Sequence, residues 1–169
     1  MKTWLRLLLV VSTVGGGFTG FSLAANGFSS FMEHGLATGL GGLTIMALYG
    51  FVTAAGLLFV YDSRRTRPML AAIALQIPWV SLPVFEYHFA AASYIAITLV
   101  LPQGPGLIGT NVEWSALLGA DCKFRFASVL EGPSSVGINL FAVLLYVLLR
   151  LSVRRFSRSP EAAPTLPAG

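Results

Sequence analysis

The chain has 169 residues, of which 55% are hydrophobic and only 11% are charged, and its formal net charge is +4. Soluble domains average about 25% charged residues, so this chain lacks the polar surface that a water-soluble protein needs. Together with a mean hydropathy of +0.75, the composition indicates an integral membrane protein, with the lipid bilayer as its surroundings. The basic residues lie in short clusters beside apolar runs, as orientation signals do, so we expect no nucleic-acid partner.

The first apolar stretch follows a basic start and allows two interpretations. Residues 1–24 have the short apolar core and the small residues of a cleavable signal peptide. Residues 5–25 are also long enough to cross a bilayer as a retained helix. Gly16 and Gly20 are four residues apart and would lie on one helix face, which lets a second helix approach closely. The sequence favours the retained span and leaves the signal peptide open.

Three further apolar stretches complete the expected membrane domain, and they cover about residues 35–61, 68–85 and 135–153. The first of these is rich in glycine at four-residue spacing. We therefore expect glycine-rich helix faces that pack against a membrane-protein partner or in a homo-oligomer. The predicted fold class is an all-α integral membrane protein with four transmembrane helices, a single domain over residues 1–153. Residues 154–169 are rich in Pro and Ala and are expected to form a disordered tail.

The segment between the third and fourth spans, residues 86–134, is predicted to form a small β-containing cap outside the membrane. Residues 89–101 are too few for a span and rich in β-branched side chains, which suits a strand, although a re-entrant or membrane-embedded segment is the alternative. Residues 122–126 alternate between apolar and basic side chains, which is the pattern of a half-buried strand. A turn at residues 119–121 would join this strand to residues 112–118 as a hairpin.

The distribution of basic residues predicts the orientation. Nine of the eleven Lys and Arg residues lie before the first span, between the second and third spans, or after the fourth. Because Lys and Arg are retained on the cytoplasmic side, both termini are expected in the cytoplasm. We expect the protein to lie in a bacterial inner membrane.

Both histidines of the chain fall at the expected outer membrane face, each beside a carboxylate. His34 and His88 are therefore candidate axial ligands of a haem. Glu86 and His88 are a candidate pair of ligands for a divalent metal ion, although side chains two residues apart share a face only on a strand. Ionisable residues at span ends more often mark where a helix reaches water, so no cofactor is predicted.

The expected third span contains residues that disfavour a straight helix, and these are Gln76, Pro78, Ser81 and Pro83. A proline inside a helix lacks a donor and clashes with the carbonyl four residues earlier, so we expect a kink whose freed carbonyls need polar partners. A broken helix of this kind can form a transport path, as it does in secondary transporters.

No motif for phosphate binding, metalloprotease chemistry or a nucleophile elbow occurs in the sequence. The sequence therefore favours a non-enzymatic accessory or interaction protein. One alternative is a small-molecule or ion carrier that uses the proline-broken third helix. Another is a haem- or metal-binding membrane protein that uses His34 and His88.

Overall fold

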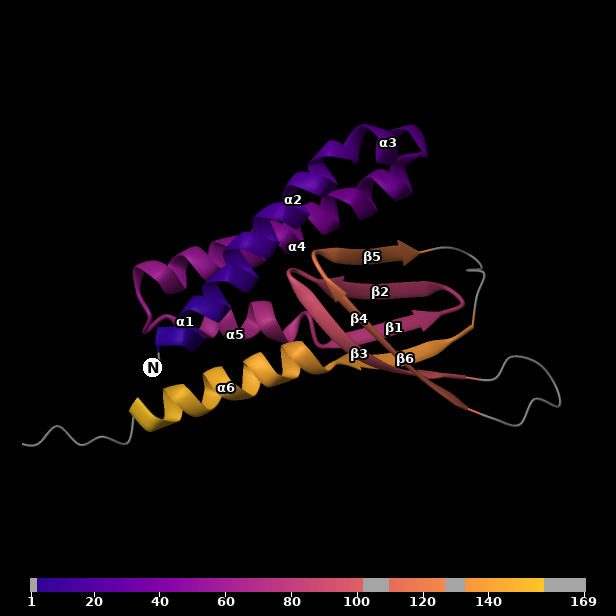
Figure 1. Ribbon diagram of the computed structural model, residues 1–169. Helices are drawn as coiled ribbons and strands as arrows, with labels where there is room; N and C mark the ends of the chain where they lie inside the picture. The colour runs from indigo at the N-terminus through magenta and orange to yellow at the C-terminus, as the bar shows by residue number, and fades with distance from the viewer. Residues whose placement is uncertain (1–2, 102–109, 127–132, 157–169) are drawn as a thin grey trace, which may run out of the picture.

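The computed structural model of the chain describes residues 3–101, 110–126 and 133–156. A layer of helices lies beside a six-stranded antiparallel sheet (Figure 1). The helices are α1 (Thr3–Val10), the π-helical segment η1 (Val11–Gly15), α2 (Gly16–Asn26), α3 (Phe28–Glu33), α4 (Leu36–Tyr61), α5 (Thr66–Ala74) and α6 (Leu140–Phe156). The strands are β1 (Pro78–Leu82), β2 (Phe85–Ala90), β3 (Ser93–Val100), β4 (Asn111–Leu118), β5 (Asp121–Phe126) and β6 (Ser135–Asn139).

The prediction of an all-α protein with four spans is wrong. The helix covers only residues 68–74 of the expected third span, because α5 ends at Ala74 and the strand β1 begins at Pro78. The prolines cannot continue a helix, and the chain resolves this by changing to strands rather than by kinking. At the expected fourth span, β6 precedes α6, which leaves a helix of 17 residues.

Two helical stretches in the described part of the chain are long and apolar enough to cross a membrane by length and composition. They are Thr3–Asn26 and Thr38–Tyr61, each of 24 residues. The apolar part of α6, Leu140–Val153, is shorter. Residues 154–156 of the expected tail belong to α6, which ends at Phe156, and residues 157–169 lie outside the described residues.

Glycines allow the helix formed by α1, η1 and α2 to pack closely against α4. A Cβ atom on Gly17 would lie 2.5 Å from the Thr53 hydroxyl oxygen, and one on Gly20 would overlap the Tyr49 ring. On α4, a Cβ atom on Gly56 would overlap Thr13 of η1. These glycine-rich surfaces, which we expected to meet a partner or another copy, therefore pack against each other within one chain.

The basic segments of the chain gather at one end of the helical layer. Arg6 donates a hydrogen bond of 2.8 Å from its guanidinium to the carbonyl oxygen of Val60, near the end of α4. A hydrophobic core holds this end together and includes Leu5, Leu9, Phe59, Met69, Ile73, Leu145 and Leu149. The start of α1, the α4–α5 connection with Arg64, Arg65 and Arg67, and the far end of α6 consequently lie near one another (Figure 1).

The sheet has the strand order β4-β3-β6-β1-β2-β5, so β4 and β5 form its two edges. Strands are present where residues 89–101, 112–118 and 122–126 predicted them. The predicted hairpin between the last two is wrong, because β4 pairs with β3 and β5 pairs with β2. Gly119, with φ of 141°, takes the chain from one edge of the sheet to the other in a conformation that favours glycine.

Strand alternation separates the sheet into an apolar face and a polar face. The pairing register places Phe89 opposite Cys122 and Tyr87 opposite Phe124 on the apolar face. On the next positions it places His88 opposite Lys123 on the polar face. The apolar face of β2 and β5 packs on the helices in a core that includes Tyr49, Val52, Ala55, Ala72, Phe89 and Ala91. The polar face is consequently turned away from the helical layer.

We predict opposite effects of alanine at two neighbouring glycines. A Cβ atom on Gly16 would lie 2.4 Å from the carbonyl oxygen of Ala91, whereas one on Gly15 would meet nothing within 4 Å. Gly15→Ala should raise the free energy of unfolding by up to about 1 kcal/mol, because alanine favours the helix. Gly16→Ala should lower the free energy of unfolding by about 1 to 3 kcal/mol, because the backbone at Ala91 must move to make room for the Cβ atom.

Denaturant unfolding of both variants in the same detergent micelles measures these changes. Gly15→Ala is the matched control, since it makes the same substitution one residue away. Equal stability of the two variants would contradict the close packing of α2 on the β2–β3 turn.

Candidate functional site

The polar face of the sheet carries a pocket of about 340 Å³. All six strands contribute to its walls, because alternate side chains of neighbouring strands point to one side. The polar and aromatic side chains that line it from this face are Trp79, Ser81, Glu86, His88, Thr98, Glu113, Ser115, Lys123 and Ser135. The pocket thus combines two carboxylates, one ammonium group, several hydroxyls and an aromatic wall.

The aromatic wall is formed by Trp79 and His88, and the ring of Tyr94 contacts both of them. The ring centroids of Trp79 and His88 are 3.5 Å apart, and those of Trp79 and Tyr94 are 4.6 Å apart with edge-on geometry. The Tyr94 hydroxyl also hydrogen-bonds with the side chain of Ser115. These contacts fix the indole and the imidazole in place, so their nitrogen atoms have defined positions at the pocket.

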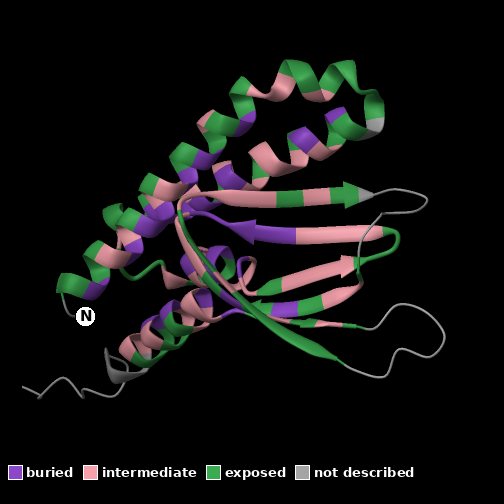
Figure 2. Cartoon of the chain, turned by 45° about the vertical axis from the view of Figure 1, so that its right-hand side comes forward, coloured by how far each residue is buried: buried purple, intermediate pink, exposed green. Residues whose placement is uncertain are grey.

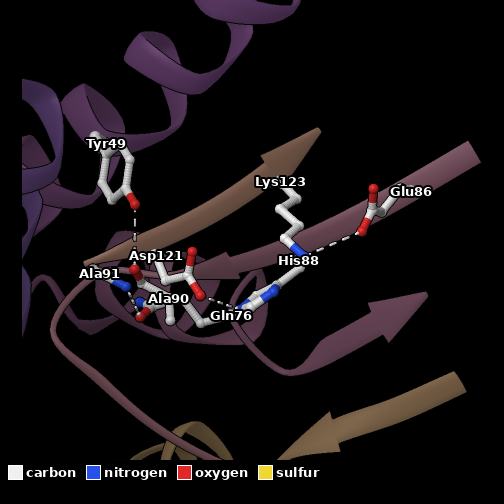
Figure 3. A network of polar contacts seen from close by, with 8 residues as sticks. All are labelled: Tyr49, Gln76, Glu86, His88, Ala90, Ala91, Asp121 and Lys123. Atoms are coloured by element: carbon white, nitrogen blue, oxygen red, sulfur yellow. Dashed lines mark hydrogen bonds and ion pairs between the residues drawn. The ribbon is translucent and has the colours of Figure 1, made fainter. Parts of the chain in front are cut away.

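His88 is buried, and burial is the main reason that its pKa is lowered from 6.5 to about 4. Asp121 opposes this change, and Lys123 adds to it. The Nε2 atom of His88 lies 3.5 Å from the Asp121 carboxylate, too far and too poorly aligned for a hydrogen bond (Figure 3). At neutral pH the imidazole is therefore uncharged, and it is not tied to the carboxylate.

Two buried nitrogen atoms at this site have no hydrogen-bond partner within the described part of the chain. They are Nε1 of Trp79 and Nε2 of His88. The indole nitrogen can only donate, whereas a neutral imidazole nitrogen donates or accepts according to its tautomer. Buried polar atoms are nearly always satisfied in native proteins, so these two atoms mark a place where a water molecule or another group can complete the hydrogen bonding.

Glu86 is paired with cations rather than with His88. Its carboxylate lies 3.7 Å from the Lys123 ammonium and 3.6 Å from the Arg125 guanidinium. Glu86 and His88 do share one face, because residues 85–90 form a strand, but the two side chains turn toward different neighbours (Figure 3). Among the described residues, no group of three or more His, Cys, Asp or Glu is placed to hold a metal ion.

His34 lies in a different part of the molecule from His88. It is exposed in the connection between α3 and α4, where its Nδ1 atom is 2.7 Å from the carbonyl oxygen of Ser30. His88 instead lies on the sheet face that is turned away from the helices. The structure therefore does not bring the two candidate haem ligands into one site.

The residues expected to kink a third span have other positions and contacts. Gln76 is buried after the end of α5, where Nε2 donates to the Ala72 carbonyl at 3.0 Å and Oε1 accepts from the Ala91 N–H at 2.9 Å. Pro78 begins β1, and Pro83 lies in the turn between β1 and β2. Only Ser81 reaches the pocket. The prediction of a kinked transmembrane helix over these residues is therefore wrong.

Sequence reasoning did not single out most of the pocket residues. Trp79 and Ser115 carried no motif, and neither did Tyr94 and Asp121, which lie beside the aromatic wall. The alternation in residues 121–125 was a usable signal, because Asp121, Lys123 and Arg125 face one side and Cys122 and Phe124 the other. On that apolar side, burial and then Asp121 raise the pKa of the Cys122 thiol to about 12.

Models of protein families, curated proteins and solved structures were each compared with this chain, and none of them matches it.

We predict that Gln76→Leu lowers the free energy of unfolding by about 1 to 3 kcal/mol, because it leaves the buried N–H of Ala91 without an acceptor. Thr44→Val is the control, since it removes an exposed bond of 2.9 Å from a side chain to the Leu40 carbonyl. It should change stability by no more than about 0.5 kcal/mol. Denaturant unfolding in one detergent compares them, and a neutral Gln76→Leu would refute the proposed role of the amide.

We also predict a pH dependence of stability that depends on His88. Between pH 6.5 and about 4, the unfolded chain binds a proton at His88 that the folded chain does not. Stability is therefore complete above pH 6.5 and decreases as the pH falls, by about 2 to 3 kcal/mol at about 1.4 kcal/mol per pKa unit.

Unfolding curves from pH 7 to pH 4 measure this loss. His88→Gln should flatten the dependence of stability on pH, whatever its effect at pH 7. His34→Gln is the matched control and should keep the wild-type slope. An unchanged slope in His88→Gln would rule out a depressed pKa at this site.

Proposed function

We propose that this chain is a non-enzymatic binding protein held in a membrane, and that its pocket takes a small uncharged or weakly basic ligand with hydrogen-bonding groups. The pair of buried nitrogen atoms without partners, on Trp79 and His88, is the observation that carries this proposal. A buried polar group without a partner costs about 1 to 3 kcal/mol, and a ligand that satisfies both atoms recovers that free energy.

The helical layer supports the membrane part of the proposal. Thr3–Asn26 and Thr38–Tyr61 have the length and composition of spans. Arg6 and the Arg64–Arg67 segment lie at one end of both stretches, as basic residues do on the cytoplasmic side of a membrane protein. A bacterial inner membrane, with that end in the cytoplasm, is the location that fits this arrangement.

The charges around the pocket favour a ligand without negative charge. Lys123 and Arg125 are already paired with Glu86. Asp121 lies beside the neutral His88, and Glu113 adds a further carboxylate to the lining. An anionic ligand would therefore meet net repulsion. The volume of about 340 Å³ is at the lower end of the range for small-molecule sites.

The same groups give little support for catalysis. A general base works best when its pKa lies near the working pH, and a pKa of about 4 makes His88 a weak base. Cys122 lies on the opposite face with a raised pKa and so stays protonated as a thiol. These features favour binding over turnover.

A thermal-shift experiment with five small probes tests the proposal. The probes are glucose, acetamide, imidazole, acetate and phosphate. We expect at least one of the first three to stabilise the wild-type protein, by about 2.7 kcal/mol at a concentration of 100 times its dissociation constant. Acetate and phosphate should have no such effect.

Trp79→Phe keeps an aromatic ring and removes the indole N–H, so it should abolish most of the stabilisation. Trp4→Phe makes the same substitution at an exposed residue of α1 and should bind as the wild type does. Binding that survives in Trp79→Phe, a preference for phosphate, or no response to any probe would each contradict the proposal.

A further inference from the structure

The apolar face of the sheet extends beyond the helices that cover it. Helices α4 and α5 cover the face at β2 and β5. On β3, β4 and β6 the same face is open, and large apolar side chains are exposed there (Figure 2). We define this open apolar face by Ile97, Leu99, Val112, Trp114, Val136 and Ile138, which are between 40% and 78% exposed.

The pairing register shows that these side chains form one surface. Ile97 lies opposite both Trp114 and Ile138, and Leu99 lies opposite both Val112 and Val136. Side chains directly opposite on neighbouring strands lie on the same face, about 5 Å apart. The surface is therefore continuous over three strands, and such a surface in a soluble monomer would be an unusual exposure of apolar area.

We propose that the open apolar face rests on lipid acyl chains at the boundary between the hydrocarbon core and the headgroups of the outer leaflet. This inference rests on the membrane part of the proposed function. It adds that the sheet itself, and not only the helices, contacts the bilayer.

The position of the sheet along α4 supports a lipid contact. Phe89 packs on Tyr49, with ring centroids 4.9 Å apart. Tyr49 is 12 residues from the basic end of α4 at Tyr61, a distance of about 18 Å along the helix. The hydrocarbon core is about 30 Å thick, so Phe89 lies in its outer half when α4 spans the bilayer. Strand β5 continues from there to Gly41 of α4, which is about 30 Å from Tyr61 and so at the outer boundary. Strands β3 and β6 continue that face toward the lipid.

The chemistry of the face favours lipid over a second copy of the chain or another protein. A specific protein interface combines an apolar centre with a polar rim and about one hydrogen bond per 100 to 200 Å². On β3, β4 and β6, no residue whose side chain lies on the open apolar face is charged. Trp114, 78% exposed, is typical of the membrane interface, where indole rings concentrate. The free edge of β4 needs water for its backbone groups, which the headgroup boundary supplies.

Tryptophan quenching by brominated lipids tests the inference without disturbing the core. The chain has three tryptophans, and both Trp4 and Trp114 are exposed. The full chain is placed in phosphatidylcholine vesicles with bromine either high or low on the acyl chains. Subtracting the emission spectrum of the Trp114→Phe variant from that of the wild type gives the emission of Trp114. The same subtraction with the Trp4→Phe variant gives the emission of Trp4. The double variant leaves Trp79 in the pocket.

We expect Trp114 to lose emission when the lipids are brominated, and to lose more with bromine high on the chain than low. Trp79 should lose little and should respond instead to iodide in the water. Quenching of Trp4 with none of Trp114 would overturn the inference and leave the membrane anchor standing. Absence of quenching at both would refute the anchor as well.

A second copy on the open apolar face is the competing result. In that case the second copy would shield Trp114 from bromine. Diluting the protein in lipid would separate the two copies, and the brominated lipids would then quench the emission of Trp114. Val112→Asp, which places a charge on an exposed position of the face, should shift the Trp114 emission to the red in vesicles. An emission maximum that stays the same would also count against the lipid contact.

Discussion

The turn between β2 and β3 is the point on which the rest of the structure depends. Gly16 of α2 approaches the carbonyl of Ala91, the Tyr49 hydroxyl of α4 donates to the Ala90 carbonyl at 3.4 Å, and Gln76 accepts from the Ala91 N–H (Figure 3). The N–H of Gly119 also donates to the carbonyl of Ala92. The three small residues Ala90, Ala91 and Ala92 are thus the point where α2, α4, the chain after α5 and the β4–β5 connection meet. Larger side chains there would separate the helices from the sheet, so small size is the constraint.

Strand alternation then assigns a role to each side of the sheet. Because every neighbouring pair of strands is antiparallel, the orientation of one strand in the sheet determines that of the others, and most of the large apolar side chains lie on one face. Helix α4 fixes that choice by packing on Phe89. The charged and hydroxyl side chains must therefore gather on the other side, where they form the pocket. The pocket therefore follows from covering the apolar face, and it requires no separate folding step.

The sequence predicted the parts of this structure that depend on local pattern. The two long apolar helices and the alternating strand at residues 122–126 follow from periodicity, and both are present. The prolines at residues 78 and 83 were interpreted as kinks within an assumed span of about 20 residues. The start of a strand and the turn that follows it accommodate proline equally well. Hydrophobicity alone does not distinguish a span from a strand whose exposed side is apolar. The apolar face of the sheet therefore gave the appearance of membrane helix.

The candidate site was beyond sequence reasoning for a different reason. His88 meets Asp121 only because β2 pairs with β5, and the connection between those strands contains β3 and β4. Local pattern does not determine which strands pair across such a distance. Glu86 illustrates the same limit: its two-residue spacing from His88 suggested a shared ligand, but the pairing register supplied Lys123 and Arg125 as closer partners.

The helices and the sheet cannot be treated as separable modules, because they share one hydrophobic core. Removing α4 would expose Phe89 and Ala91, which are fully buried beside it, and would cost the transfer free energy of those side chains. It would also remove the hydroxyl of Tyr49 from the Ala90 carbonyl. The Ala90–Ala92 turn follows His88 by two residues, so a disturbance there would reach the aromatic wall directly. The proposed membrane anchor and the proposed binding site therefore depend on the same packing of α4 against the sheet.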